Sequence, residues 1–187
     1  MKKKEIDYFS ALYEVAKVIN ASLDLSTVLN KIVQCVTQVM HVKACSIRLL
    51  DSRKKQLVLG AAHGLSKGYL HKGPILIKES GLDRKALSGK TLWLKNVQID
   101  KDFQYRAMAK AEGIKSVFVV PLLVQKKAIG VLRVYSESIH KFNDEDIKYL
   151  EAVGNLSAIA LDNAKHHKTL QMQCDLMAAH KYRIDDN

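Results

Sequence analysis

The sequence predicts an α+β fold in which helices gather on one face of an antiparallel sheet. Two pairs of strand-like segments, each joined by a short polar link, lie at residues 44–63 and 116–135. Apolar residues at helical spacing precede the first pair and follow the second, and an irregular, glycine-containing stretch separates the pairs. Strands with short links pair antiparallel. The irregular stretch would then cover the sheet face that the helices leave open, with space for a small molecule beneath it.

The clearest hairpin comprises Ser116–Val124 and Ala128–Tyr135, with a polar link at residues 125–127. Its first strand is apolar almost throughout, as expected of a strand that is covered on both faces. Its second strand alternates, with Gly130, Leu132 and Val134 on one face and Arg133 and Tyr135 on the other. A glycine within a strand lets another part of the chain approach closely, and we expect this at Gly130.

The earlier hairpin is predicted from Ala44–Leu50 and Gln56–His63, which flank a polar loop. Alternation places Ile47 and Leu49 on the face opposite Arg48. We expect the apolar face of each hairpin to contact the helices.

Two helices are predicted before the first hairpin. Residues 5–21 show an amphipathic pattern. Asp24 suits the N-cap of the second helix, which continues to Met40, and Leu23 can pack against Val28 as a hydrophobic staple.

The last helix has the strongest start signal in the sequence. Asn143 suits its N-cap, Asp146 occupies the capping-box position, and Phe142 can pack against Ile147. Helical periodicity covers residues 144–164, and no breaker follows, so the helix can continue.

A heptad-like seam runs along this last helix, with spacings of four and three residues. Its members are Leu156, Ala160, Asn163, His167, Leu170, Cys174 and Met177. The polar members suit a coiled coil of fixed register, but a chance pattern on a solvated helix explains the spacing equally well.

The stretch between the hairpins has few regular signals. Leu82–Leu87 is consistent with a short helix and Thr91–Leu94 with a short strand that carries the single tryptophan, Trp93. Residues 97–115 include Phe103 and show little periodicity. Long irregular connections that carry aromatic residues are usually functional or mobile.

Length and composition exclude several classes of protein. The chain has 187 residues, 48% of them hydrophobic, which suits one globular domain with helical extensions. No apolar run approaches the ~20 residues of a membrane span, and the lysines at residues 2–4 run into Glu5 and Asp7 instead of a signal-peptide segment. We therefore expect a cytoplasmic protein with no membrane partner.

The net charge of +11 raises the question of nucleic acid. The lysines are spread along the chain, and no arginine-rich helix or aromatic RNA-binding set is present, so a solvated basic surface is the better interpretation. The three cysteines, Cys35, Cys45 and Cys174, form no CxxC pair and are expected to be reduced thiols.

The order of these segments resembles a GAF domain, the PAS-related small-molecule sensory module of signalling proteins. The likeness covers residues 23–164. It rests on the segments Leu23–Leu25, Ala44–Asp51, Gly113–Leu122, Ile129–Leu132, Phe142–Asp146 and Ala158–Ala164. The resemblance implies a six-stranded antiparallel sheet with the N- and C-terminal helices on one face and a ligand pocket under loops and short helices on the other. It also implies dimers formed through the terminal helices, and a division into an N-terminal helix (1–22), the GAF domain (23–165) and a C-terminal helical extension (166–187).

Members of this family bind different ligands, and the sequence does not assign a cofactor. Residues 142–145 match part of a cyclic-nucleotide motif but lack its Asn-Lys pair, and helix capping already explains them. His63 at a strand end could bind haem, although a solvent-facing histidine is the simpler interpretation. Bilin attachment would need a cysteine by the pocket, and methionine sulfoxide reduction would need several clustered there. Neither fits the predicted positions of the three cysteines on a helix, at the start of a strand and in the tail. We predict no catalytic residue, no metal site and no enzymatic activity.

The candidate ligand site rests on strand alternation. Arg48 and Arg133 project from the same sheet face, where two guanidinium groups could bind a carboxylate or phosphate. We expect an anionic small molecule on this pair, with Trp93, Phe103 and Tyr135 as walls. The alternative is that both arginines pair with acidic residues of the cover or reach water.

We therefore expect a sensory module that forms a homodimer. Because the chain contains no output domain, we expect it either to act on a downstream signalling protein or to be a fragment of a longer protein. The alternatives are a ligand-free dimerisation or protein-interaction module, a cyclic-nucleotide or haem sensor, and nucleic-acid association through the basic surface.

Overall fold

The computed structural model describes residues 7–22 and 24–185. Its centre is an antiparallel six-stranded sheet with the order β3-β2-β1-β6-β5-β4, which confirms the predicted fold class. The strands are β1 (Ala44–Leu50), β2 (Gln56–His63), β3 (Ile75–Leu76), β4 (Leu92–Leu94), β5 (Ser116–Val124) and β6 (Lys127–Ser136). Both predicted hairpins are present, and β1 pairs with β6 at the centre of the sheet.

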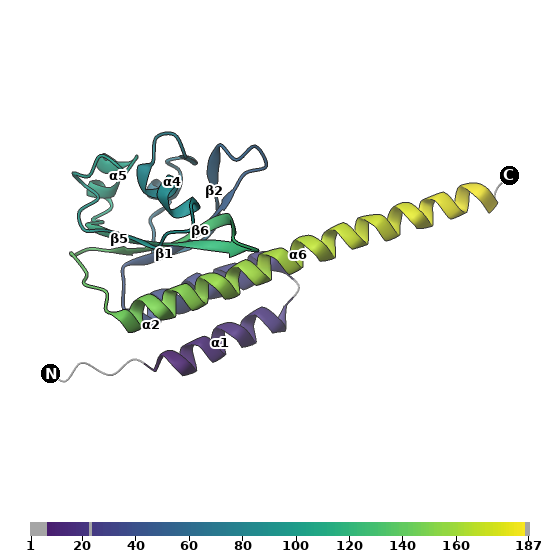
Figure 1. Ribbon diagram of the computed structural model, residues 1–187, viewed down its shortest axis with the longest axis horizontal. Coiled ribbons are helices and arrows are strands. Elements are labelled where there is room, and N and C mark those ends of the chain that lie inside the picture. The colour runs from purple at the N-terminus through teal and green to yellow at the C-terminus, as the bar shows by residue number, and fades with distance from the viewer. Residues whose placement is uncertain (1–6, 23, 186–187) are drawn as a thin grey trace.

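Helices α2 (Leu25–Val39) and α6 (Asp144–Asp185) cover one face of the sheet, and α1 (Tyr8–Ala21) packs against both of them (Figure 1). The short helices α3 (Lys67–Leu70), α4 (Gly81–Leu87) and α5 (Arg106–Ala111) lie with their loops on the other face. We call residues 64–115 the cover. The sequence predicted α4 and β4 to within a residue, but it gave no signal for α3, β3 or α5.

The caps form as the side chains suggested. The Asp24 carboxylate accepts hydrogen bonds from the backbone N–H groups of Ser26 and Thr27. The Asn143 side chain accepts from the Asp146 N–H at 2.8 Å, and the Asp146 carboxylate accepts from the Asn143 N–H at 2.9 Å. Leu23, the other half of the predicted staple of α2, lies outside the described residues.

Two details of the central hairpin refine the sequence interpretation. The link between β5 and β6 is shorter than predicted, because Gln125 and Lys126 alone form the turn with φ of 47° and 66°. Positive φ at both positions matches the twist of a two-residue hairpin. The close approach expected at Gly130 is made by β1, since a Cβ there would lie 2.4 Å from the Arg48 carbonyl oxygen.

Helix α6 is 42 residues long and continues well past the sheet (Figure 1). Its side chains are exposed from Lys165 to Met177. Among residues 7–22 and 24–185, none of the helices combines the length and apolar character that a bilayer crossing needs.

Candidate functional site

The two faces of the sheet are covered by cores of different character. The helix-side core is apolar and includes Ile47, Leu132 and Val134, as alternation predicted. The cover-side core contains apolar residues together with three buried charged side chains, Arg48, Asp83 and Arg133. Their exposed fractions are 1%, 0% and 2%, so charge is concentrated beneath the cover.

The strand register brings the two arginines together. Ser46 lies opposite Arg133 and Arg48 lies opposite Val131, so the arginines are diagonal neighbours on one face. Side chains on such diagonals are within reach of each other. Arg48 and Arg133 therefore lie beside each other on the cover side of the sheet, as strand alternation predicted.

Arg133 is paired within the protein. Its Nε donates to Asp83 Oδ1 at 3.1 Å, and its Nη2 donates to Asp83 Oδ2. Asp83 is held in the first turn of α4, whose N-cap Ser80 also donates to the Asp83 carboxylate. Burial opposes the charge, but the adjacent carboxylate raises the pKa of Arg133 above its usual value. The predicted alternative, an arginine that pairs with an acid of the cover, is realised at Arg133.

Arg48 is buried to the same degree but is not paired. Its Nε and Nη2 have no hydrogen-bond partner among the described residues. These are the same two nitrogens that hold Asp83 in the case of Arg133. Together they form the edge of the guanidinium that binds a carboxylate or phosphate through two parallel hydrogen bonds.

A lysine and a tyrosine of the cover lie beside the arginines. Within the described chain, Lys72 Nζ and Tyr69 Oη are buried without a hydrogen-bond partner. Lys72 Nζ lies 3.1 Å from the centroid of the Tyr69 ring and 5.2 Å from that of Tyr105. Burial, and then the charges of Arg133 and Arg48, lower the pKa of Lys72 to about 6. We call Arg48 Nε and Nη2, Lys72 Nζ and Tyr69 Oη the donor cluster.

The structure brings two of the three predicted aromatic walls to this site. The Phe103 ring lies 5.5 Å from the Arg133 guanidinium carbon. The Tyr135 hydroxyl is 3.0 Å from Ser46 Oγ, and its ring packs edge-on against Tyr69.

Trp93 is not brought to the arginines. It packs edge-on against Phe142 in the helix-side core, with 6.4 Å between ring centroids. On β4 it pairs with Phe118 and shares that residue's face, whereas Leu92 and Leu94 face the cover. A strand of three residues gave too little alternation to assign this face from sequence.

Sequence reasoning missed Asp83, Lys72 and Tyr69. Asp83 lies in a segment predicted as a helix, where an acidic residue in the first turn is explained by the helix dipole alone. Lys72 lies between α3 and β3, where no periodicity exists to show which side chains point inward. A lysine beside Gly73 and Pro74 gave no signal that could have distinguished it from the other lysines.

The histidine and the cysteines that the sequence offered as candidates lie away from the donor cluster. His63 is exposed at the end of β2. Cys45 belongs to the helix-side core, where burial raises the pKa of its thiol, Cys35 is partly buried on α2, and Cys174 is exposed on α6. Residues 7–22 and 24–185 contain no group of three His, Cys, Asp or Glu side chains placed to hold a metal ion.

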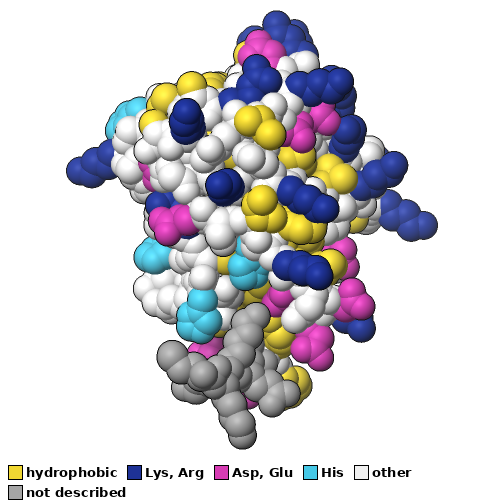
Figure 2. All heavy atoms as spheres, turned by 90° about the vertical axis from the view of Figure 1, so that its left-hand side faces the viewer, with side chains coloured by type: hydrophobic (Ala, Val, Ile, Leu, Met, Phe, Trp, Pro, Cys, Tyr) yellow, Lys and Arg dark blue, Asp and Glu magenta, His cyan; other side chains and the backbone are white. Residues whose placement is uncertain are grey.

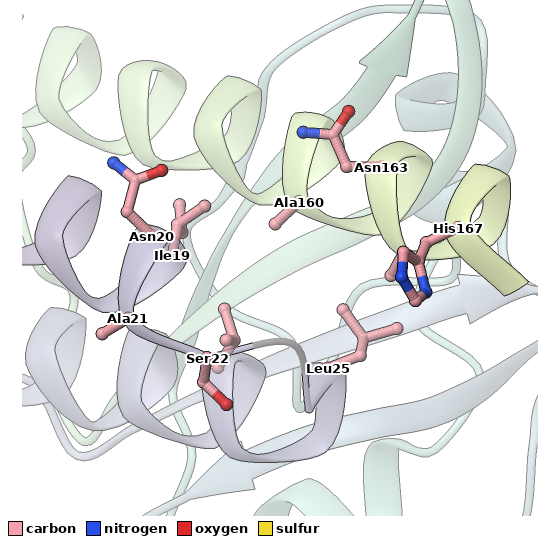
Figure 3. Close-up of a pocket in the computed structure, with 10 residues that line it drawn as sticks. Ile19, Asn20, Ala21, Ser22, Leu25, Ala160, Asn163 and His167 are labelled. Carbon is pink, nitrogen blue, oxygen red and sulfur yellow. The ribbon is translucent and has the colours of Figure 1, made fainter.

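The described residues also form surface hollows outside the donor cluster. One, of about 400 Å³, lies where the end of α1 and the start of α2 meet α6, with Asn20, Asn163 and His167 around it (Figure 3). Another, of about 780 Å³, lies along the β1–β2 turn, β3 and α4 and has a basic lining that includes Arg53, Lys54, Lys55, Lys78 and Arg84. Figure 2 shows Lys and Arg side chains scattered over one face among side chains of other types.

The sequence and the fold have relatives among known proteins. The family model of the GAF domain matches residues 22–162. The formate hydrogenlyase transcriptional activator of Salmonella typhimurium (strain SL1344) is 24% identical over 166 residues, which cover 86% of this chain and 24% of that protein. The chain thus spans about a quarter of the length of that relative.

Solved structures share the fold at low sequence identity. The GAF domain of a phosphoenolpyruvate-protein phosphotransferase from Coxiella burnetii superimposes with a TM-score of 0.79 at 17% identity, covering 89% of this chain and 99% of that one. The free methionine-R-sulfoxide reductase of Neisseria meningitidis gives 0.73 at 20% identity, with coverage of 89% and 95%.

The domain occurs in regulatory proteins such as transcriptional activators and sensors, and some proteins of this fold are enzymes. The family match extends over most of the chain, and the structure superimposes on a solved GAF domain over most of its length. This chain belongs to the GAF domain family.

Proposed function

We propose that this GAF domain is a non-catalytic sensory module that binds a small anionic molecule beneath the cover and signals through its terminal helices. The observation that carries the proposal is Arg48, a guanidinium that is 1% exposed and whose Nε and Nη2 find no partner in the described part of the chain. Arg133 and Tyr135 of β6 complete the site on the sheet side, and Phe103 does so from the cover.

Burial without a partner makes the charge of Arg48 destabilising for the folded protein. An unpaired ion in a protein interior costs several kcal/mol of folding free energy. A bound carboxylate or phosphate would offset this cost at Arg48, as the Asp83 carboxylate does at Arg133. The difference between the two arginines therefore favours an anion from outside the chain.

Burial of the donor cluster implies that a ligand enters only when the cover moves. The cover consists of short elements that apolar packing and hydrogen bonds hold in place, among them Tyr105 Oη to the Pro74 carbonyl at 2.8 Å and the Leu76 N–H to Gln104 Oε1 at 3.0 Å. Binding that requires cover movement selects one arrangement of the cover over another, which is the basis of a sensor.

The terminal helices offer an output. The Tyr8 hydroxyl donates to the Asp146 carboxylate, which ties α1 to the start of α6. Apolar side chains are exposed on both helices, including Phe9 at 82% on α1 and Leu170 and Met177 at 60% and 74% on α6. We infer that these surfaces form a homodimer, that the seam of α6 lies within it, and that the change reaches a downstream protein through α6.

The comparisons support a regulatory role for the domain, since one relative is described as a transcriptional activator. The absence of catalysis in this chain is a proposal that rests on its cysteines, which lie at three separated places and are not gathered under the cover.

The test is native mass spectrometry of the purified protein, followed by measurement of the same sample after denaturation. We expect a mass excess that is lost on denaturation and is absent from the Arg48→Met variant. An unchanged excess in Arg48→Met would contradict the proposed site, and a monomer in the native spectrum would contradict the proposed dimer.

A second candidate function has its own supporting observation. Apolar side chains that are fully buried fill much of the cover-side core, which is expected of a domain that binds no ligand and serves only dimerisation or protein interaction. They include Leu57, Ile75, Val97, Ile114 and Val119. A dimer whose mass equals that of two bare chains would favour this second function.

A further inference from the structure

The hydrogen-bonding character of the donor cluster limits the kinds of ligand that it can bind. Each of its four atoms can donate a hydrogen bond. The Arg48 guanidinium has no acceptor atom, and the Lys72 amine has none once it is protonated. The acceptor that lies near, Asp83, is occupied by Arg133. Groups that only accept, such as carboxylate and phosphate oxygens, fit such a set.

The charges that face Lys72 come from four elements. Arg48 on β1 and Arg133 on β6 are positive, and Asp83 on α4 and Glu112 at the end of α5 are negative. Asp83 neutralises Arg133, and Glu112 accepts hydrogen bonds from the N–H and hydroxyl of Ser66. Arg48, which is a cation, and Lys72, which becomes one when protonated, are the basic side chains left for a ligand in this part of the described structure.

We propose that the ligand is a small dianion that places one oxyanion group on the Nε and Nη2 edge of Arg48 and its second negative charge beside Lys72, which takes up a proton as the ligand binds. The proposal rests on the proposed function and deepens it. Binding adds two negative charges from the ligand and one proton from solvent to a site that already contains the Arg48 cation, so the charges balance.

Physical chemistry gives the reason for the proton. Burial and two guanidinium groups oppose the ammonium form and lower the pKa of Lys72 to about 6, while the Tyr69 ring face favours that form. An anion beside Lys72 reverses the local charge and raises this pKa. Above about pH 6 the free site must therefore gain a proton to bind a dianion, and its affinity falls by about tenfold per pH unit.

The experiment titrates the protein with oxalate, a small dianion that is fully ionised above pH 6, and with acetate as the singly charged comparison. Calorimetry in HEPES and in Tris at about pH 7.5 reports proton uptake through the difference between the observed heats, because the two buffers release protons with different enthalpies. We expect oxalate to bind with uptake of close to one proton and acetate to bind more weakly with almost none.

Two matched variants distinguish a specific role of Lys72 in binding from the general effect of removing a positive charge. Lys72→Met should weaken oxalate at least tenfold at about pH 6.5 and abolish both proton uptake and pH dependence. Lys78→Met removes an exposed lysine of the basic hollow. It should leave the affinity for oxalate, the proton uptake and the pH dependence unchanged. Equal effects of the two variants would overturn the role of Lys72.

A measurement without ligand guards against a folding defect in the variants. The ¹³C signal of the Lys72 ε-carbon, assigned by its loss in Lys72→Met, should titrate near pH 6 in the free protein and above pH 8 with saturating oxalate. A free-protein titration near the ordinary lysine value of about 10.4 would overturn the proposal.

The outcomes also distinguish the proposed anion-sensing function from the proposed proton uptake at Lys72. Oxalate binding that depends on Arg48 but brings no proton leaves the proposed function intact and overturns the role of Lys72. If neither oxalate nor acetate binds, the anion-sensing function fails together with this inference.

Discussion

The two faces of the sheet are built from the same strands but have opposite designs. On the helix side, long helices cover an apolar core, and each side chain contributes by packing. On the cover side, short elements enclose Arg48, Arg133 and Asp83, which are among the least exposed residues of the chain. The helix-side core thus consists of packed apolar side chains, whereas the cover side also retains buried charges that stability alone does not explain.

The largest expected effect comes from breaking the charge pair of the cover side. Asp83→Asn keeps the shape of the side chain but leaves Arg133 buried and unpaired, which should cost about 3–5 kcal/mol of unfolding free energy. Urea denaturation measures this loss. Lys85→Ala removes the partly exposed ion pair with Asp102 and should cost less than about 1 kcal/mol. Similar losses for the two variants would show that the buried pair has no special role.

The next expected effect is an increase in unfolding free energy, where the first was a decrease. Arg48→Met replaces a buried, unpaired guanidinium by an apolar side chain, so we expect a gain of roughly 1–4 kcal/mol in unfolding free energy together with loss of anion binding. Leu132→Ala on the helix side should lose about 2–5 kcal/mol and retain binding. Urea denaturation and oxalate calorimetry on both variants test the pair. A destabilised Arg48→Met would mean that Arg48 is held by interactions that contribute to folding.

A smaller effect concerns pH. Because the pKa of Lys72 is lowered to about 6 in the folded protein and is about 10.4 when unfolded, the unfolded chain binds more protons between these values. Stability should therefore rise with pH across this window, by up to about 1.4 kcal/mol per pH unit, and this contribution should be flat below about pH 6.

The measurement compares the natural protein with Lys72→Met by urea unfolding at about pH 7 and about pH 8. We expect the variant to be the more stable protein and its advantage to shrink by about 1.4 kcal/mol over that pH unit. Parallel pH profiles would show that Lys72 is already charged in the folded protein.

The smallest change in stability is expected on the exposed part of α6. Leu170→Ser should alter the unfolding free energy of the subunit by less than about 0.5 kcal/mol, because the side chain is 60% exposed. It should nevertheless weaken the proposed dimer, as measured by light scattering, and reduce disulfide crosslinking of the exposed Cys174. Lys168→Ser, off the seam of the same helix, serves as the control and should leave the dimer intact.

Much of the fold could be predicted because its signals are local. Caps at Asp24 and Asn143 and the period of two in β1 and β6 depend on neighbours in sequence, and alternation alone placed Arg48 and Arg133 on one face. The partner of Arg133 could not be predicted in this way, because Asp83 lies 50 residues before it in a segment without strand periodicity.

The orientations of the Lys72 and Trp93 side chains could not be predicted from the sequence either. Lys72 occupies a short connection whose backbone positions follow from tertiary packing, and Trp93 belongs to a strand of three residues. Where elements are this short, contacts far apart in sequence decide which side chains point inward. The residues of the donor cluster that the sequence missed, Lys72 and Tyr69, both lie in this cover.

The length of α6 turns the domain into the base of a lever. The part of the helix beyond Ala164 extends for about 30 Å at the usual rise of 1.5 Å per residue, so a tilt of about 5° at its base would displace its far end by about 3 Å. The hollow between the end of α1, the start of α2 and α6 lies at this pivot. A tilt of this size at the base of α6 would therefore reach a partner as a displacement comparable to the width of a side chain.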